Sequence, residues 1–263
     1  MRRGAVAVAF VAVAYALAPA PPLLSPCAWQ ADHCARTYGF VRDHYETDRY
    51  APDLGNWGVP YRAYADGYVA AVAGELELRD GASVFESGVG GGWFLRALAE
   101  ALPQTLRVAG NDVSEVALSE ARRAVPTGTF CVGDSLNLTW VQEASFDAVL
   151  CAYLEVGRAA SPAAEADVSG RWVREMARLA RPGGRVFVGA NRPPADWDGT
   201  AASDIAPFGV PVTWWRDCAA SDAYGWDVDP ASVRVEPLAD EGLARSWGSR
   251  YHVYMRRRER GAG

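Results

Sequence analysis

The chain has 263 residues, of which 50% are hydrophobic and 22% are charged, as in an ordinary globular protein. Its length is sufficient for one sizeable core, and no compositional break marks a second domain. The formal net charge of -6 disfavours a nucleic-acid partner, because such a surface needs clustered cations. Every basic residue is arginine, which excludes lysine chemistry and a lysine-containing phosphate loop.

The N-terminus carries an apolar segment. Arg2 and Arg3 precede an apolar run from Gly4 to Ala18, which a proline-rich stretch follows. Because the run is shorter than the roughly 20 residues of a spanning helix, residues 1–26 resemble a signal segment; a membrane anchor, an organelle presequence or a misassigned start are the alternatives. The segment predicts the secretory pathway or an organelle, or the cytoplasm if it is not functional. We expect no stable membrane insertion beyond it.

Five cysteines cannot all pair within one chain. Cys27 and Cys34 lie close together after the apolar run and could form a disulfide if the compartment is oxidising. Cys131 and Cys151 fall in apolar, strand-like segments, where we expect buried small hydrophobes. The sequence has no Cys-x-x-Cys motif or Cys/His cluster, so it predicts no metal site.

Residues 27–80 are rich in aromatic side chains and predict a cap of two or three helices. The helical spacing of Tyr61, Tyr64 and Tyr68 marks one apolar face. This face could act as a lid or simply pack against the core.

From Ala82 onward, short apolar runs alternate with helical stretches, the pattern of βαβ units and a parallel sheet. The last two predicted strands are expected to pair in antiparallel fashion. The sequence thus predicts an α/β fold, doubly wound, with a mostly parallel seven-stranded sheet and an N-terminal helical cap. The predicted strands are Ser83–Glu86, Leu106–Gly110, Thr129–Val132, Phe146–Ala152, Arg185–Gly189, Val233–Leu238 and Tyr251–Met255.

Local signals place the ends of several helices. Pro103 ends the first helix after the glycine-rich segment, and Ser114 is a good N-cap with Glu115 in the first turn. The Arg181–Gly184 segment predicts a turn that ends a helix and leads into the next strand.

The segment Val84–Gly92 places alternating glycines where an apolar strand meets a helix. Glycines at such a turn allow unusual dihedral angles and the close approach of a ligand to the main chain, so a nucleotide-like ligand is expected. The dinucleotide fingerprint requires a small residue at its third glycine position, where this chain has Trp93. A pyrophosphate ligand therefore fits poorly.

The glycine segment resembles motif I of class I S-adenosylmethionine-dependent methyltransferases. That motif is E/D-x-G-x-G-x-G, met here by Glu86, Gly88, Gly90 and Gly92. The resemblance covers about residues 61–189 and implies a Rossmann-like fold with S-adenosyl-L-methionine as the cofactor. It also implies that residues 27–263 form one methyltransferase domain, with the cofactor-binding core in residues 81–190.

The same resemblance assigns residues at the ends of the next two strands. Asp112 stands where the family's acid binds both ribose hydroxyls, and a carboxylate can accept two charge-assisted hydrogen bonds from a cis-diol. Asp134 stands where the family places a polar or acidic residue at the adenine amino group. Val113 and Ser135 complete the predicted cofactor-binding set. The alternatives are a first-turn helix charge for Asp112 and a turn residue for Asp134.

The resemblance implies methyl transfer to an acceptor, and proximity and orientation can supply on the order of 7–11 kcal/mol for it without a dedicated base. We expect a small-molecule acceptor and no nucleic acid. An inactive cofactor-binding scaffold, a protein methyltransferase and, least favoured, a nicotinamide-dependent oxidoreductase are the alternatives. The acceptor atom and the oligomeric state stay open.

The catalytic residues are not identified by the sequence. Tyr153 and Glu155 follow the fourth strand, where substrate and cofactor meet in this family, and His44 lies in the helical cap. Each is a weak candidate beside a structural role. Residues 191–263 would hold an acceptor loop and the last strands. The aromatic residues of this region either wall an acceptor pocket or cover the sheet: Trp197, Phe208, Trp214, Trp215, Tyr224 and Trp226.

Overall fold

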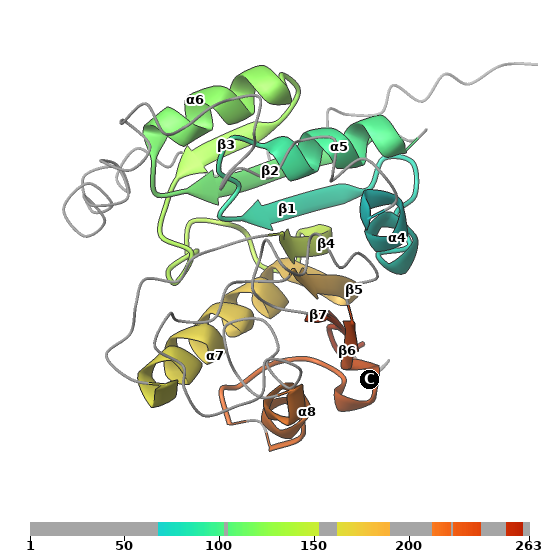
Figure 1. Cartoon of the computed structure of the whole chain (residues 1–263), viewed down its shortest axis with the longest axis vertical. Helices are drawn as coiled ribbons and strands as arrows, with labels where there is room; N and C mark the ends of the chain where they lie inside the picture. The colour runs from blue at the N-terminus through green and yellow to red at the C-terminus, as the bar shows by residue number, and fades with distance from the viewer. Residues whose placement is uncertain are drawn as a thin grey trace, which may run out of the picture.

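The computed structural model describes residues 68–102, 105–152, 162–189, 212–221, 223–237 and 251–259 of the chain. The strands are β1 (Ser83–Ser87), β2 (Arg107–Asp112), β3 (Thr129–Val132), β4 (Phe146–Cys151), β5 (Ala180–Val188), β6 (Arg234–Pro237) and β7 (Tyr251–Arg256). The helices are α4 (Tyr68–Glu75), α5 (Trp93–Ala101), α6 (Glu115–Ala124), α7 (Pro162–Leu179) and α8 (Val212–Ser221), with a 3-10 turn η4 (Pro230–Ser232). Figure 1 shows α5 and α6 on one side of the sheet and α7 on the other.

The seven strands form one sheet in the order β3-β2-β1-β4-β5-β7-β6. The first five pair in parallel, whereas β7 is antiparallel to both β5 and β6. The strand order reverses between β1 and β4, and open α/β sheets bind ligands at such a switch point, beyond the carboxyl ends of the strands. The predicted Rossmann-like, mostly parallel seven-stranded sheet is therefore confirmed.

The central strands are buried on both faces, as expected for a parallel sheet covered by helices. Phe85 and Val149 belong to the apolar layer that contains Trp172 of α7. Val84 and Ala148 face the opposite layer, together with side chains of α4, α5 and α6. This packing fixes the strands rigidly, so that the carboxyl ends of β1, β2, β3 and β4 lie along one edge of the sheet.

The turn predicted at Arg181–Gly184 is wrong in its placement, because α7 ends at Leu179 and β5 begins directly at Ala180. Phe146 pairs with Ala180 but Ala148 pairs with Arg185, so the intervening residues of β5 bulge out of the ladder. Gly183 in this bulge has a φ of 73°, which glycine adopts without the steric cost of a side chain. The proline and glycine signal marks a bulge within the strand.

Cys131 in β3 is disulfide-bonded, so the expectation of a simple buried hydrophobe is wrong at this position. Cys151, at the end of β4, is buried and is not part of a disulfide, as expected, and the same holds for Cys218 of α8. Cys27 and Cys34 lie outside the described residues.

Several predictions fall on residues that the structure does not describe. These include the signal-like segment, residues 1–26, and all of the predicted helical cap except α4 and the turn after it. Among the described helices, none combines the length and the apolar character needed to cross a membrane.

Candidate functional site

The loop from β1 to α5 lies at the carboxyl edge of the sheet. It contains glycines at positions where a residue with a side chain would be strained. Gly88, Gly90 and Gly92 have φ angles of 72°, 51° and 77°, all in the left-handed region. Gly92 is the N-cap of α5, and a Cβ there would lie 3.0 Å from Cα of Ala121 in α6. The alternating glycines are therefore required by the backbone, and they leave bare main chain beside a helix N-terminus.

Asp112 is the last residue of β2, and its carboxylate is tied to this loop. Oδ2 accepts a hydrogen bond from the Gly90 N–H at 2.9 Å, and Oδ1 accepts one from the Ser114 N–H at 3.0 Å. Each carboxylate oxygen has a second lone pair, so both can still accept a ligand hydroxyl. Burial raises the pKa of Asp112 to about 6, although the backbone bonds partly oppose the rise.

Glu86, in β1, lies beside Asp112 and is only 2% exposed. Burial raises its pKa well above the ordinary value of 4.5, and the neighbouring Asp112 adds to the rise. Its Oε2 has no hydrogen-bond partner among the described residues. A buried polar atom without a partner costs about 1–3 kcal/mol, so a polar ligand group at this edge would be stabilising.

Asp134 and Ser135 follow β3 and are both buried. Asp134 Oδ1 accepts a hydrogen bond from the Leu136 N–H at 2.8 Å, a contact typical of an aspartate in a turn. Asn111, which the sequence analysis missed, joins the ends of β2 and β3: its Nδ2 donates to Gly133 O at 2.8 Å and to Ser135 Oγ at 3.0 Å. The sequence feature that could have identified Asn111 is its position, as an amide side chain at the end of an apolar strand and directly before Asp112.

Asn111 also presents an acceptor to the site. Its Oδ1 is buried and has no hydrogen-bond partner among the described residues. Because the amide nitrogen is held by two acceptors, the oxygen is fixed in direction. Asn111 is thus a rigid acceptor at the end of β2, directly before Asp112 in the chain.

A second contact missed by sequence reasoning holds the start of the glycine loop. Ser87, the last residue of β1, accepts a hydrogen bond from Nε1 of Trp172 in α7 at 2.9 Å. Trp172 is fully buried. The bond ties the loop to the helix on the opposite face of the sheet, and no local pattern connects two residues so far apart in the sequence.

The structure therefore brings most of the predicted site residues to one edge, where the loops after β1, β2 and β3 meet (Figure 1). Val113 is half-buried beside Asp112. The three weak catalytic candidates, Tyr153, Glu155 and His44, lie outside the described residues. No cluster of metal-ligating side chains occurs in the part of the chain that the structure describes.

Four aromatic residues proposed for an acceptor pocket lie instead in a hydrophobic cluster against α7. Trp215 and Trp226 are fully buried, and the ring centroids of Tyr224 and Trp226 are 6.1 Å apart. Trp214 contacts Trp226 edge to face, with the centroids 5.5 Å apart. Hydrophobic covering therefore holds for Trp215 and Trp226, whereas Trp214 and Tyr224 pack against this cluster but are only partly buried. Trp197 and Phe208 lie outside the described residues.

Replacing Trp226 with Phe tests this structural role. Trp226 Nε1 donates to Gly170 O at 2.7 Å, and the substitution leaves that buried carbonyl without its donor. We expect the free energy of unfolding in urea to fall by about 1–2 kcal/mol, with cofactor affinity unchanged. Unaltered stability together with impaired turnover of an acceptor would contradict the structural role.

Comparison with known proteins gives the family of this domain. Residues 84–184 match the family model of a methyltransferase domain. No curated protein matches the sequence significantly. The match spans the glycine loop, the ends of β2 and β3, and the start of β5, which are the elements that form the site.

Three solved structures share the fold. The S-adenosylmethionine-bound amino pentose methyltransferase of Micromonospora echinaspora is 14% identical with a TM-score of 0.52, covering 75% of this chain and 91% of that chain. An O-methyltransferase family protein from Burkholderia thailandensis is 16% identical with a TM-score of 0.53, and the match covers 90% of this chain and 65% of that chain. Phosphoethanolamine N-methyltransferase 1 of Haemonchus contortus is 11% identical with a TM-score of 0.52, and the match covers 91% of this chain and 51% of that chain. Together with the family match, the fold identifies residues 84–184 as part of a class I S-adenosylmethionine-dependent methyltransferase domain, whose cofactor is S-adenosylmethionine.

Proposed function

We propose that this protein transfers a methyl group from S-adenosylmethionine to a small-molecule acceptor, mainly by proximity and orientation. The observation that carries the proposal is the 2.9 Å bond from the Gly90 N–H to Asp112. It holds a carboxylate suited to a ribose diol directly beside the bare main chain that would accommodate the methionine part of the cofactor.

The residues present fit this cofactor. Asp112 would accept both ribose hydroxyls, since each of its oxygens retains a lone pair. The half-buried Val113 would contact the adenine ring, and Asp134 and Ser135 would lie at its amino group. Glu86 Oε2 and Asn111 Oδ1 are the unpaired buried acceptors that a polar ligand would satisfy.

Bound S-adenosylmethionine supplies a methyl group on a sulfonium, which is already a good leaving group. The chain therefore has to orient an acceptor in line with that methyl group, and orientation can contribute on the order of 7–11 kcal/mol. Tyr153, Glu155 and His44 are the side chains that we propose as candidates for holding the acceptor.

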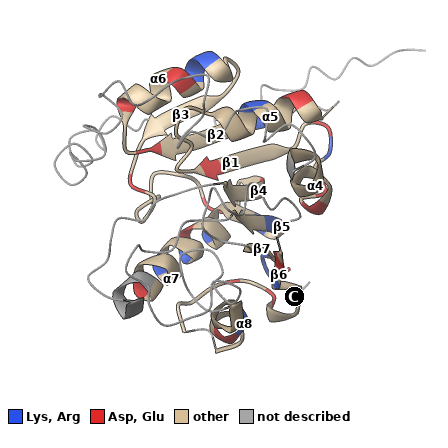
Figure 2. Ribbon diagram, viewed as in Figure 1, with Lys and Arg blue, Asp and Glu red and all other residues tan. Residues whose placement is uncertain are grey.

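The distribution of charge supports a small acceptor. Figure 2 shows basic and acidic residues interspersed along α5, α6 and α7. Several of them form exposed pairs, such as Arg96 with Glu100 and Arg171 with Asp167. A nucleic-acid acceptor would instead need a surface of clustered cations. Two structures of similar fold are enzymes whose names give small acceptors, an amino pentose and phosphoethanolamine.

The acceptor can be sought by incubating the full chain with methyl-labelled S-adenosylmethionine and fractionated metabolites, followed by mass spectrometry. We expect label in a small molecule and none when Asp112→Ala replaces the wild type. Label found only in protein would replace the small acceptor with a protein acceptor. Cofactor binding without any labelled product would favour an inactive scaffold.

Cofactor affinity is expected to fall as the pH drops below about 6. The raised pKa of Asp112, about 6, means that its carboxylate takes up a proton there, and only the ionised form can accept both hydroxyls. Affinity should be full well above this pH and weaken about tenfold per pH unit below it. Burial lowers the pKa of His252 to about 4, which places that group outside the window. Calorimetric titration between about pH 5 and 8 measures the effect.

The Asp112→Asn variant is the control for this pH dependence, because its side chain cannot ionise. It should bind weakly and lose the part of the pH dependence that comes from Asp112, and any change that remains would come from Glu86, whose pKa burial also raises. A wild-type affinity that stayed constant between about pH 5 and 7 would rule out a role for Asp112 ionisation in binding.

We propose that residues 1–26 direct the chain to the secretory pathway or to an organelle. The short apolar run after Arg2 and Arg3 supports this, as does the disulfide at Cys131, because such bonds persist in oxidising compartments. Imaging a tagged full-length chain beside one that lacks residues 1–26 tests the proposal, and identical distributions would refute it.

A further inference from the structure

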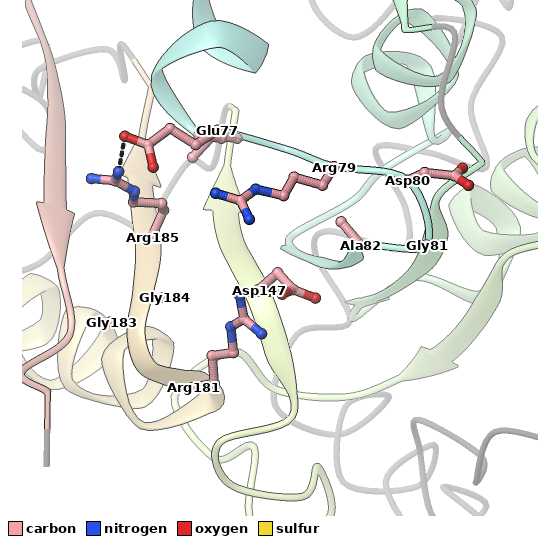
Figure 3. A pocket seen from close by; sticks show the side chains of 11 residues that line it. Glu77, Arg79, Asp80, Gly81, Ala82, Asp147, Arg181, Gly183, Gly184 and Arg185 are labelled. Carbon is pink, nitrogen blue, oxygen red and sulfur yellow. Dashed lines mark ion pairs between the residues drawn. The ribbon is translucent and has the colours of Figure 1, made fainter. Parts of the chain in front are cut away.

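A cavity of about 480 Å³ opens at the amino edge of the sheet (Figure 3). Its walls come from the segment between α4 and β1, from the start of β4 and from the bulge of β5. Asp112 and the glycine loop lie at the opposite, carboxyl ends of the strands, so this cavity is separate from the cofactor site. Its volume falls in the range of about 300–1,000 Å³ that is typical of small-molecule pockets.

Three arginines line the cavity, and two of them are neutralised by carboxylates. Arg185 pairs with Glu77, and Arg181 pairs with Asp147 at 2.8 Å. The bond from Arg185 lowers the pKa of Glu77, which keeps that pair charged. The second oxygen of Asp147 accepts the N–H and the hydroxyl of Ser83 at 2.8 and 2.7 Å. Both carboxylates are therefore already engaged.

Arg79, the third arginine, forms no ion pair within 4 Å among the described residues, although it is near enough to Glu77 to help lower the pKa of that group. Figure 3 shows its side chain extending toward the wall made by β4 and β5. The neighbouring Asp80 also lines the cavity, and its Oδ1 accepts a hydrogen bond from the Thr105 N–H at 2.8 Å. Three guanidinium groups and three carboxylates thus line the cavity, and the carboxylates already accept bonds within the chain, which leaves the donors of Arg79 available to a ligand.

Bare main chain completes the walls. Gly81 and Gly183 have φ angles of 75° and 73°, and a Cβ added at Gly81 would meet no atom within 4 Å. The cavity is therefore open at this wall, and its lining combines arginines, carboxylates that already accept bonds, and main chain. Such a lining suits an anionic ligand with several acceptor oxygens.

We propose that this cavity binds a small organic phosphate, with Arg79 as its main contact. A phosphate group carries about -1.5 to -2 charges and three strong acceptor oxygens, more than one guanidinium fork can satisfy. Arg181 and Arg185 each have five N–H donors, so they can contact the same group while they keep their carboxylate partners. A single carboxylate, with two oxygens, would use Arg79 alone. Because the cavity lies at the far edge from the methyl donor, the phosphate compound is an effector or second ligand and not the methyl acceptor.

The proposal is tested on the full chain by calorimetric titration with glucose 6-phosphate and inorganic phosphate at constant ionic strength, with glucose and malonate as comparison ligands. We expect saturable binding of both phosphate probes and at least about tenfold weaker binding by Arg79→Gln, since a hydrogen bond to a charged group contributes about 1.5–3 kcal/mol. Arg79→Lys keeps the charge but loses the fork and should be intermediate. Arg123→Gln, an exposed arginine of α6 paired with Glu120, is the matched control and should bind like the wild type.

Thermal unfolding and S-adenosylmethionine affinity should be unchanged in Arg79→Gln, which shows that the loss is local to the cavity. No saturable binding of either phosphate probe, or equal binding by the wild type and Arg79→Gln, would overturn the proposal. Tighter binding of malonate than of both phosphate probes would overturn the assignment to phosphate.

Discussion

Asp112→Ala is expected to weaken S-adenosylmethionine binding by about 100-fold or more while the protein stays folded. The carboxylate would make two charge-assisted hydrogen bonds to the ribose, and bonds to charged groups contribute about 1.5–3 kcal/mol each. In the wild type the Gly90 N–H donates a hydrogen bond to Asp112 Oδ2 at 2.9 Å. The substitution removes this acceptor, so the glycine loop loses its bond to the end of β2. The two losses act on the same ligand and should reinforce each other. Calorimetric titration with the cofactor measures the change.

The matched control for this experiment is Asp167→Ala. Asp167 is an exposed carboxylate of α7 whose only ion pair among the described residues is with Arg171. Its removal should leave cofactor affinity unchanged and alter stability by less than about 1 kcal/mol. Equal cofactor affinity in Asp112→Ala and the wild type would eliminate Asp112 as the ribose ligand.

The part of the site that could be predicted is the part governed by local rules. Alternating glycines after an apolar strand predict a loop with left-handed backbone angles, and Gly88, Gly90 and Gly92 adopt them. Asp112 could be placed because the carboxyl ends of parallel strands share one edge of a sheet. Neither inference requires knowledge of which distant segments meet.

The contacts that escaped prediction depend on pairs of distant residues. The Trp172 indole reaches Ser87 only because α7 crosses the sheet beneath the end of β1. Asn111 reaches Ser135 only because β2 and β3 are adjacent and in register. The spacing of residues along the sequence shows neither the path of α7 nor the register of β2 and β3. Ser87 and Asn111 therefore could not be recognised as part of the site from the sequence.

The aromatic residues near α8 show a different limit. Aromatic side chains are common both in ligand pockets and in protein cores, because a large apolar surface is stabilising when it is buried in either. Trp226 was assigned to its role only by burial and by the bond to Gly170 O in α7. Likewise, the proline and glycine of the β5 bulge signal a break in regular backbone, but whether it falls before or within a strand depends on the register with β4.

Gly110→Ala is expected to lower the free energy of unfolding by about 2–3 kcal/mol and the melting temperature by roughly 5–10 °C. Gly110 pairs with Glu86 across β1 and β2, and a Cβ there would lie 2.8 Å from Glu86 O and 3.2 Å from Val89 Cβ. The oxygen belongs to the backbone of a central strand, so it cannot turn aside as a flexible side chain could. The two strands must separate locally to admit the methyl group.

The same displacement should weaken cofactor binding, because Val89 donates its N–H to Asn111 O at 2.8 Å and thereby sets the loop against β2. Gly74→Ala in α4 is the matched control: a Cβ there meets no atom within 4 Å, so a helical alanine should raise stability by about 0.5–1 kcal/mol and leave binding unchanged. Urea unfolding and cofactor titration of both variants separate the two effects. If Gly110→Ala were as stable as the wild type, the close approach of β1 and β2 at this position would not constrain the site.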